Sequence, residues 1–280
     1  MTATNPFIPR ILLAFDFDRT LGTDSIEAIC AAYGVTRDDW ERRFEAPLGE
    51  GWDEVLKRGW ALIELGKAMG RPLGPDVMRA AAGELQLYPG VMEVPRRLRA
   101  AVAGIDPEIT LEFVVLSSGF AEIIDASGVG RVFDRILAGA FHEGEDGLCL
   151  GVKRVVGHPE KVLYLEALGK GADIDGANAP ERAGDPVAPE SMHCPFDQMI
   201  YVGDGVSDLQ AFEFLTGAGG IAIAVDKDGR FAALEQTEAQ RVDDLAPPDY
   251  SEGSELLAVL DHAVRAAAHR IAIRREGRGE

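Results

Sequence analysis

Asp16 and Asp18 stand two residues apart in the segment FDFDRTL, directly after the apolar run 11–15. An apolar run of that length predicts a buried strand, whose side chains alternate between two faces. The two carboxylates then point the same way beside a buried element. A carboxylate in such a place is costly unless it is paired, protonated or bound to a metal. The pair therefore indicates a functional site, and the alternative is a strand that ends in a solvated acidic turn.

A second apolar run, 113–116, ends in Ser117, Ser118 and Gly119, and a helix is predicted over residues 120–126. A strand that passes through small hydroxyl residues into a helix offers a hydroxyl and free N–H groups to an anion. The alternative is that one serine only caps the helix.

A third run, 199–202, closes on the segment GDGVSD, which holds Asp204 and Asp208. Glycines on both sides of Asp204 let the backbone approach a ligand closely. The alternative is a tight Asp-Gly turn capped by Ser207 or Asp208.

Lys161 follows Pro159, which suits the first turn of a helix carrying apolar residues at 162, 165 and 168. A single helical lysine is usually solvated. Its place in the order of the motifs is what gives Lys161 weight.

The motifs read, in chain order, DxDxT, a strand ending in Ser, a Lys at a helix start, and GDGxxD. This order resembles the haloacid dehalogenase superfamily, specifically its phosphatases of the phosphoserine phosphatase type, over residues 11–214. The first and last motifs are specific, whereas the Ser and Lys motifs are individually weak. The resemblance implies an α/β fold with a Rossmann-like, mostly parallel sheet and helices on both faces. Ligands of open α/β sheets bind outside the carboxyl ends of the strands, where each motif lies.

The resemblance implies a Mg²⁺-dependent phosphatase acting on a small phosphorylated metabolite through an aspartyl-phosphate. Asp16 is the expected nucleophile, and Asp18 the group that protonates the leaving oxygen and then deprotonates water. Asp16 and Asp204 are the expected side-chain ligands of Mg²⁺, a hard cation that prefers oxygen. Asp18 is expected to add its backbone carbonyl as a third ligand.

The remaining site residues are expected to hold the phosphoryl group or to support the site. Lys161 and Ser117 would contact the phosphoryl oxygens, assisted by N–H groups near Ser118 and Gly119. Two further residues have supporting roles: Thr20 in the loop after the nucleophile, and Asp208, which would orient Lys161 or a water on the metal.

Residues 23–87 are rich in helical pattern and predict a helical cap, while 1–22 and 88–280 form the catalytic core. Trp52, Leu56, Trp60 and Ile63 recur at spacings of four, four and three, which indicates one amphipathic helix. Further helices are expected over residues 24–33, 37–44 and 76–85. An insertion that leaves the chain directly after Asp16 begins above the catalytic edge, so it would exclude water and select substrates.

The rest of the core follows from local pattern. Strands are expected over 133–138 and, as the last one, 221–225, with a hairpin tip at 144–147 and a helix from Ser254. Residues 169–197 are rich in Gly, Ala, Asp and Pro and predict a flexible or partner-contacting loop at the sheet edge opposite the chemistry.

Composition fits a soluble enzyme. The net charge of −19 over 280 residues argues against nucleic acid or an acidic membrane as a partner. No apolar segment approaches the length of a membrane span. Cys30, Cys149 and Cys194 are odd in number and widely spaced, which suggests reduced thiols and a cytoplasmic protein.

Three other functions compete with a phosphatase. A dehalogenase of the same superfamily lacks the second aspartate, so Asp18 argues against it. A phosphotransferase or phosphomutase keeps all four motifs and stays open. A non-catalytic binding or regulatory module has no reason to retain so costly a group of charges.

The resemblance departs from phosphoserine phosphatases at two positions that hold the amino acid. Ser25 and Gly59 stand where those enzymes carry an acidic residue and a cap arginine. The nearby charged residues are Asp24, Glu27, Lys57 and Arg58. The departure argues against phosphoserine as the substrate and leaves the prediction of a phosphatase unchanged.

Overall fold

The computed structural model describes residues 7–174, 180–205, 207–226 and 242–277. One seven-stranded sheet has the order β4-β3-β2-β1-β5-β6-β7, in which all neighbours are parallel except the β3–β4 hairpin. Its strands are β1 (Arg10–Phe15), β2 (Thr110–Phe120), β3 (Arg135–Glu143), β4 (Cys149–Arg154), β5 (Met199–Gly203), β6 (Ile221–Val225) and β7 (Asp244–Ala246). The strand order reverses at β1, which lies between β2 and β5. Such a switch point is where open α/β sheets bind ligands.

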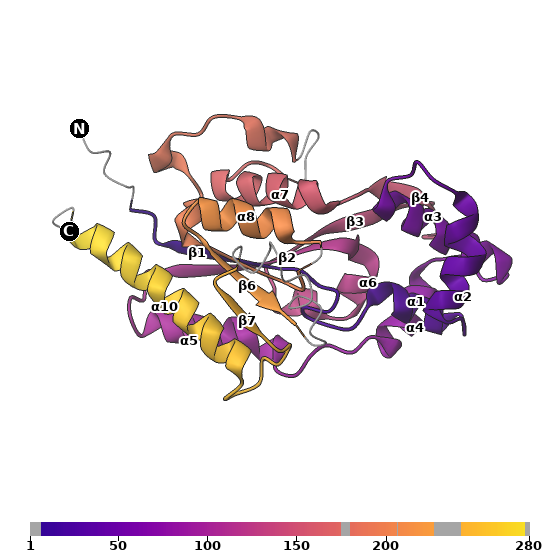
Figure 1. The fold of residues 1–280 in the computed structure, drawn as a ribbon, viewed down its shortest axis with the longest axis horizontal. Coiled ribbons are helices and arrows are strands. Elements are labelled where there is room, and N and C mark those ends of the chain that lie inside the picture. The colour runs from indigo at the N-terminus through magenta and orange to yellow at the C-terminus, as the bar shows by residue number, and fades with distance from the viewer. Residues whose placement is uncertain (1–6, 175–179, 206, 227–241, 278–280) are drawn as a thin grey trace.

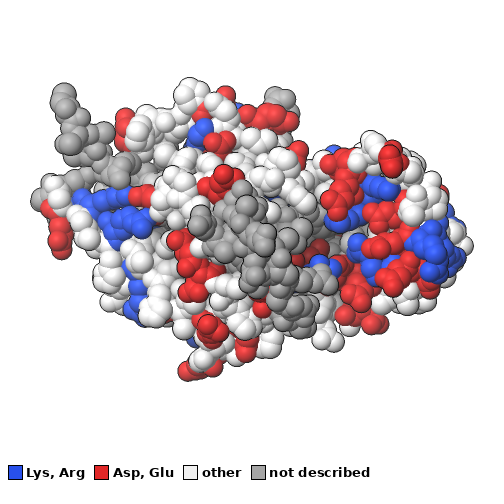
Figure 2. Space-filling view, viewed as in Figure 1, with Lys and Arg blue, Asp and Glu red and all other residues white. Residues whose placement is uncertain are grey.

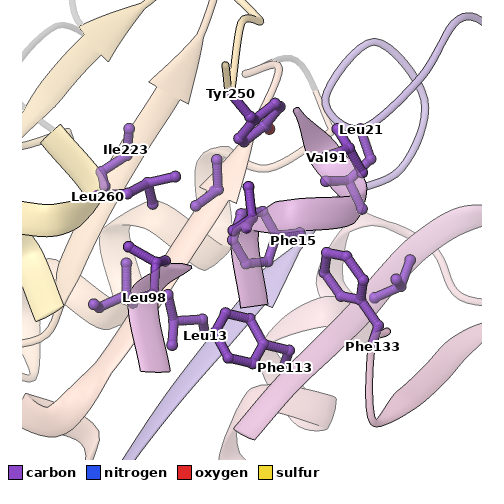
Figure 3. Close-up of a cluster of buried hydrophobic side chains, with 14 of the residues drawn as sticks. Leu13, Phe15, Leu21, Val91, Leu98, Phe113, Phe133, Ile223, Tyr250 and Leu260 are labelled. Atoms are coloured by element: carbon purple, nitrogen blue, oxygen red, sulfur yellow. The ribbon is translucent and has the colours of Figure 1, made fainter. Parts of the chain in front are cut away.

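The central strands are buried on both faces, and their side chains divide between two cores. In β1, Leu13 and Phe15 belong to one hydrophobic cluster while Leu12 and Ala14 belong to the other. The alternation follows from the two-residue period of a strand. Figure 3 shows the first cluster, in which Phe15 lies near Phe113, Phe133 and Tyr250. The apolar residues 11–15 therefore hold β1 between two layers of helices.

Helices cover both faces of the sheet (Figure 1). One face carries α5 (Val94–Ala103) and α10 (Glu255–Glu276), and the other carries α7 (His158–Lys170) and α8 (Leu209–Gly217). The short α6 (Ala121–Ala126) follows β2 directly. This arrangement confirms the predicted Rossmann-like α/β fold. No described helix is long and apolar enough to cross a lipid bilayer.

A group of helices lies between β1 and β2 in the chain, as the helical pattern predicted. It consists of α1 (Ser25–Ala32), α2 (Arg37–Trp40) with a π-helical turn (Glu41–Glu45), α3 (Glu54–Ala68) and α4 (Pro75–Glu84). These helices form a third hydrophobic cluster that includes Phe120 of β2 and Phe141 of β3, whose rings stack 4.2 Å apart. Figure 1 shows them at one end of the molecule, where the β3–β4 hairpin reaches α3. The division of the chain into a core and a cap at 23–87 stays a prediction.

The predicted face of α3 is wrong in one respect. Trp52 precedes the helix and is 39% exposed, while the buried residues of α3 include Val55, Gly59 and Leu62. The predicted spacing placed the helix correctly, and of the four residues that define it Ile63 is buried, Leu56 and Trp60 are half-buried and Trp52 is exposed. The two indole rings pack against each other at 6.3 Å instead of entering the core.

Two boundaries also differ from the sequence prediction. β2 does not end at the serines but continues through Ser117 to Phe120, and its register against β3 shifts between these two residues, which leaves Ser118 and Gly119 in a β-bulge. Ile221–Val225 is not the last strand, because the short β7 pairs with it. The hairpin tip at 144–147 and the helix capped by Ser254 are confirmed.

The insertion at 169–197 lies at the opposite edge of the sheet, as predicted. His193 bonds through Nε2 to Glu112 near the start of β2, at 2.6 Å, and its carbonyl accepts from Arg10 at the start of β1. Its described part contains three short 3-10 helices (Glu181–Gly184, Pro189–Ser191, Phe196–Gln198) and the fully buried Cys194. This part of the insertion is therefore packed against the core.

Gly59 tests how α3 is held against the sheet. A Cβ at this position would lie 2.5 Å from Val152 and 2.7 Å from the Phe120 ring. We predict that Gly59→Ala lowers stability by about 1–3 kcal/mol, because overpacking outweighs the helix propensity gained. Gly83→Ala is the control, since nothing lies within 4 Å of its Cβ. Thermal unfolding should show a lower Tm for the first variant and an unchanged or higher one for the second, and the reverse order would contradict this packing.

Candidate active site

The predicted motif residues converge at the carboxyl ends of β1, β2 and β5. Six of the predicted residues line a pocket of about 240 Å³, whose wall continues onto α1, α2 and α3, whereas Thr20, Lys161 and Asp208 are not in its described lining. The lining residues are Asp16, Asp18, Arg19, Asp24, Ile26, Arg37, Glu54, Arg58, Ser117, Ser118, Gly119, His158, Asp204 and Ser207. Segments that lie up to 190 residues apart in the chain are brought to one edge of the sheet.

Lys161 is fully buried, and its ammonium has three acceptors. Its Nζ lies 3.1 Å from Asp16 Oδ1, 2.6 Å from Asp208 Oδ1 and 3.2 Å from Ser207 Oγ. Three acceptors match the three hydrogens of an ammonium. The two carboxylates raise the pKa of Lys161 above its usual value although burial lowers it. The lysine is therefore held charged, beside the first aspartate of the motif.

Asp208 is the residue that fixes Lys161 from the other side. Its Oδ1 also accepts from the Tyr201 hydroxyl at 2.6 Å, and its Oδ2 accepts from the Gly205 amide at 3.2 Å. A Cβ at Gly203 would lie 2.3 Å from Oδ2, so the carboxylate needs the first glycine of GDGVSD. The sequence prediction missed Tyr201, because a tyrosine inside a buried strand reads as one more core residue.

Asp16, Asp204 and Asp208 each place a carboxylate oxygen within 4.8 Å of the others. Burial, and then the neighbouring carboxylates, raises the pKa of Asp204 to about 8. Burial also raises the pKa of Asp16, to about 6, although the Lys161 ammonium opposes it. A cluster of oxygen donors that repel each other in this way suits a hard cation.

Asp18 lies in the same pocket but outside that cluster. Ser25 at the start of α1 donates its amide to Oδ1 at 2.7 Å and its hydroxyl to Oδ2 at 3.0 Å. Burial, followed by the charges of Asp24 and Asp16, raises the pKa of Asp18 to about 7. The two motif aspartates thus differ in partner, because only Asp16 faces an ammonium.

The bulge in β2 carries the predicted phosphate-binding residues. Ser117 accepts a hydrogen bond from the Gly119 amide at 3.0 Å, and Gly119 lies beside the Asp18 carboxylate. The Ser118 hydroxyl is buried and has no partner among the described residues. Thr20 is buried, and its carbonyl accepts from the Tyr250 hydroxyl at 2.8 Å, which anchors the loop after Asp18 to the core.

The wall opposite the sheet contains charged residues of both signs. Asp24 caps α1 and bonds to Arg19 and Arg37, each at 3.2 Å, while Arg58 pairs with Glu54. Of the two positions singled out by the family resemblance, Ser25 binds Asp18 and Gly59 packs against Phe120. Their charged neighbours Asp24 and Arg58 line the pocket, whereas the described lining contains neither Glu27 nor Lys57.

Solved structures with a similar fold share little sequence with this chain. A haloacid dehalogenase family hydrolase from Salmonella enterica serovar Typhi has a TM-score of 0.57 at 14% identity, over 91% of this chain and 71% of that one. A probable phosphoserine phosphatase from Vibrio cholerae has a TM-score of 0.57 at 17% identity, over 96% and 69%. A phosphoserine phosphatase solved as an analogue of its phospho-aspartyl intermediate has 0.53 at 16%, over 90% and 98%. No protein-family model and no curated protein matches the sequence.

These similarities concern the fold. The chain has the α/β architecture of haloacid dehalogenase family hydrolases, which the order of its motifs predicted. What the pocket does chemically depends on the residues described above.

Repulsion within the carboxylate cluster predicts how stability depends on pH when metal is removed. The pKa of Asp204 is above its usual 3.8, so its ionisation destabilises the fold as the pH rises from 4 to 8. We expect Asp204→Asn in chelator to raise the Tm at pH 8 by at least about 2 °C, and to leave it unchanged at pH 4. Asp38→Asn, on the exposed side of α2, is the control. A lower Tm for Asp204→Asn at pH 8 would show that the carboxylate stabilises the site.

Proposed function

We propose that this protein is a Mg²⁺-dependent phosphatase that hydrolyses a small phosphorylated metabolite through an aspartyl-phosphate on Asp16. The observation that carries the proposal is the buried ammonium of Lys161, 3.1 Å from Asp16, which lines one pocket together with Asp18. The similar fold of a phosphoserine phosphatase solved as a phospho-aspartyl intermediate analogue supports it.

The carboxylate cluster fits Mg²⁺ by the chemistry of its donors. Asp208 Oδ1 already accepts from Lys161 and Tyr201, which leaves Asp16 and Asp204 as the side chains that would hold the ion. The Asp18 carbonyl would be the third protein ligand. The ion would offset the repulsion between these carboxylates and a phosphate dianion.

In the first step, a carboxylate oxygen of Asp16 attacks phosphorus while the bond from phosphorus to the leaving oxygen breaks. Asp18 gives its proton to that oxygen. A pKa raised to about 7 keeps a fraction of Asp18 protonated near neutral pH, as a general acid requires. Ser25 holds both oxygens of Asp18 and so sets the direction of the proton transfer.

In the second step, water attacks the phosphorus of the aspartyl-phosphate. Asp18, now ionised, takes the proton from this water, and the Asp16 carboxylate is released together with inorganic phosphate. The same residue therefore acts first as acid and then as base.

Lys161 and Ser117 would hold the phosphoryl oxygens through both steps, with a phosphoryl oxygen replacing Ser207 Oγ, at 3.2 Å, as an acceptor of Lys161. Phosphoryl transfer depends mostly on positioning and on electrostatic stabilisation, which a buried, fixed ammonium supplies at no cost of reorganisation. Asp208 acts through Lys161, to which it bonds directly, and Tyr201 acts through Asp208.

The proposal predicts hydrolysis of an aryl phosphate in the presence of Mg²⁺ and loss of that activity in chelator. Asp16→Asn should reduce turnover to the uncatalysed background, and Asp18→Asn should reduce it about 10²–10⁴-fold. Release of phenol and phosphate should be followed together, because phenol release without phosphate would indicate a transferase. Unchanged turnover by the Asp16 variant would contradict the mechanism.

The α3 wall predicts where substrate preference is set. Arg58 lines the pocket and Lys57 does not appear in its described lining, so we expect Arg58→Ala to change relative kcat/KM across a panel of phosphorylated metabolites. Lys57→Ala is the adjacent control and should keep the wild-type order of substrates. An equal loss on every substrate in the Arg58 variant would argue against a role in specificity.

A further inference from the structure

Arg19 has a backbone conformation that its residue type disfavours. Its φ of 61° makes it the single non-glycine residue with positive φ among those described. Glycine adopts this left-handed conformation freely, whereas a residue with a Cβ is strained there. The Arg19 amide donates to the Gly22 carbonyl at 2.7 Å, which closes the turn after Asp18. Glycine would form this turn with less strain, so the presence of arginine indicates a role for its side chain.

The side chain of Arg19 faces the pocket between the sheet and the helices. It lines the pocket, and its Nη2 lies 3.2 Å from Asp24 Oδ2 at the start of α1. Asp204 of the carboxylate cluster lines the same pocket. Arg19 therefore stands over the space between the carboxylate cluster and the α1 wall.

That space is where the variable part of a substrate must lie. The leaving oxygen has to meet Asp18, because Asp18 supplies its proton in the proposed mechanism. Asp24 precedes Ser25, whose amide and hydroxyl bond to Asp18, so the leaving group emerges beside Asp24 and its two arginines. Arg19 is then adjacent to the group that distinguishes one phosphate ester from another.

The guanidinium of Arg19 also forms few hydrogen bonds with the described part of the protein. It makes one side-chain hydrogen bond to a described residue, out of five N–H donors, and the side chain is 46% exposed. Asp24 is shared with Arg37 at the same distance, so one carboxylate faces two guanidinium groups. Figure 2 shows the interleaved charges over the α1–α4 end of the molecule. Within a chain of net charge −19, a cation with free donors beside the site favours an anion.

We propose that Arg19 binds a second anionic group of the substrate, either a carboxylate or a second phosphate, on the leaving-group side of the scissile phosphoryl. The inference rests on the proposed phosphatase function and narrows its substrate class to phosphate esters that carry a second anionic group. The alternative is that Arg19 only holds Asp24 in place. The two roles predict different effects of Arg19 substitutions on thermal stability.

The test compares kcat/KM for two matched pairs of esters, using the full chain with Mg²⁺. Phosphoglycolate against ethyl phosphate probes a carboxylate, and propane-1,3-diol bisphosphate against propyl phosphate probes a second phosphate. We expect wild type to prefer the anionic member of one pair. Arg19→Ala and Arg19→Gly should each reduce that preference about 10–100-fold, the loss expected for hydrogen bonds to a charged group. Arg79→Ala, an exposed arginine paired with Asp76 on α4, should keep the preference.

Thermal unfolding separates recognition from structure. Arg19→Gly relieves the left-handed strain and removes an exposed ion pair of little worth, so its Tm should equal or exceed that of wild type by about 2 °C. A lower Tm together with an unchanged preference would assign Arg19 a structural role and overturn the inference.

The pair that responds identifies the anion. If wild type hydrolyses an aryl phosphate but shows no preference within either pair, the inference about Arg19 fails and the proposed function stands. If wild type hydrolyses no phosphate ester, both fail.

Discussion

The rest of the site depends on one buried ion pair, between the ammonium of Lys161 and the carboxylates of Asp16 and Asp208. An ammonium without any exposure is tolerable only when its partners surround it, and here three acceptors do so. The pair joins the end of β1 to the first turn of α7 and to the start of α8. Tyr201 and the Gly205 amide donate hydrogen bonds to Asp208. Lys161 in turn donates to both Asp208 and Asp16. The position of the proposed nucleophile is therefore set by contacts that reach across the sheet.

The same constraint separates the roles of two aspartates that are neighbours in sequence. Asp16 faces a cation, which favours its ionised form and opposes the effect of burial. Burial and the nearby charge of Asp24 favour the protonated form of Asp18, although the two hydrogen bonds donated by Ser25 oppose them. A nucleophile and a proton donor require this difference. The helices after β1 contribute to it, because Asp24 comes from the start of α1. The α1–α4 segment thus shapes the acid as well as the pocket wall.

The sequence predicted the sheet and its catalytic edge because buried strands read as apolar runs and the motif residues follow them directly. It did not predict the bonds from Tyr201 to Asp208 and from Ser25 to Asp18, because each depends on how the chain turns over seven residues, which the residue types do not show. The extent of the insertion's packing was missed since Cys194 and Ala183 become buried only through tertiary contacts. The exposure of Trp52 shows the limit of periodicity, which locates a helix more reliably than its buried face. The backbone strain at Arg19 could not be anticipated, since the segment DRT is compatible with an ordinary turn.

The central claim is that Asp16 becomes covalently phosphorylated, and acid quenching followed by peptide mass spectrometry tests it most directly. Wild type and Asp18→Asn would be mixed with an aryl phosphate and Mg²⁺, quenched within the first turnover and digested. The account predicts one added phosphoryl group on the peptide that contains Asp16. The group should accumulate in Asp18→Asn, because that variant lacks the base for the second step. A quenched, actively hydrolysing enzyme with no phosphoryl group on Asp16, or with the group on another residue, would contradict it.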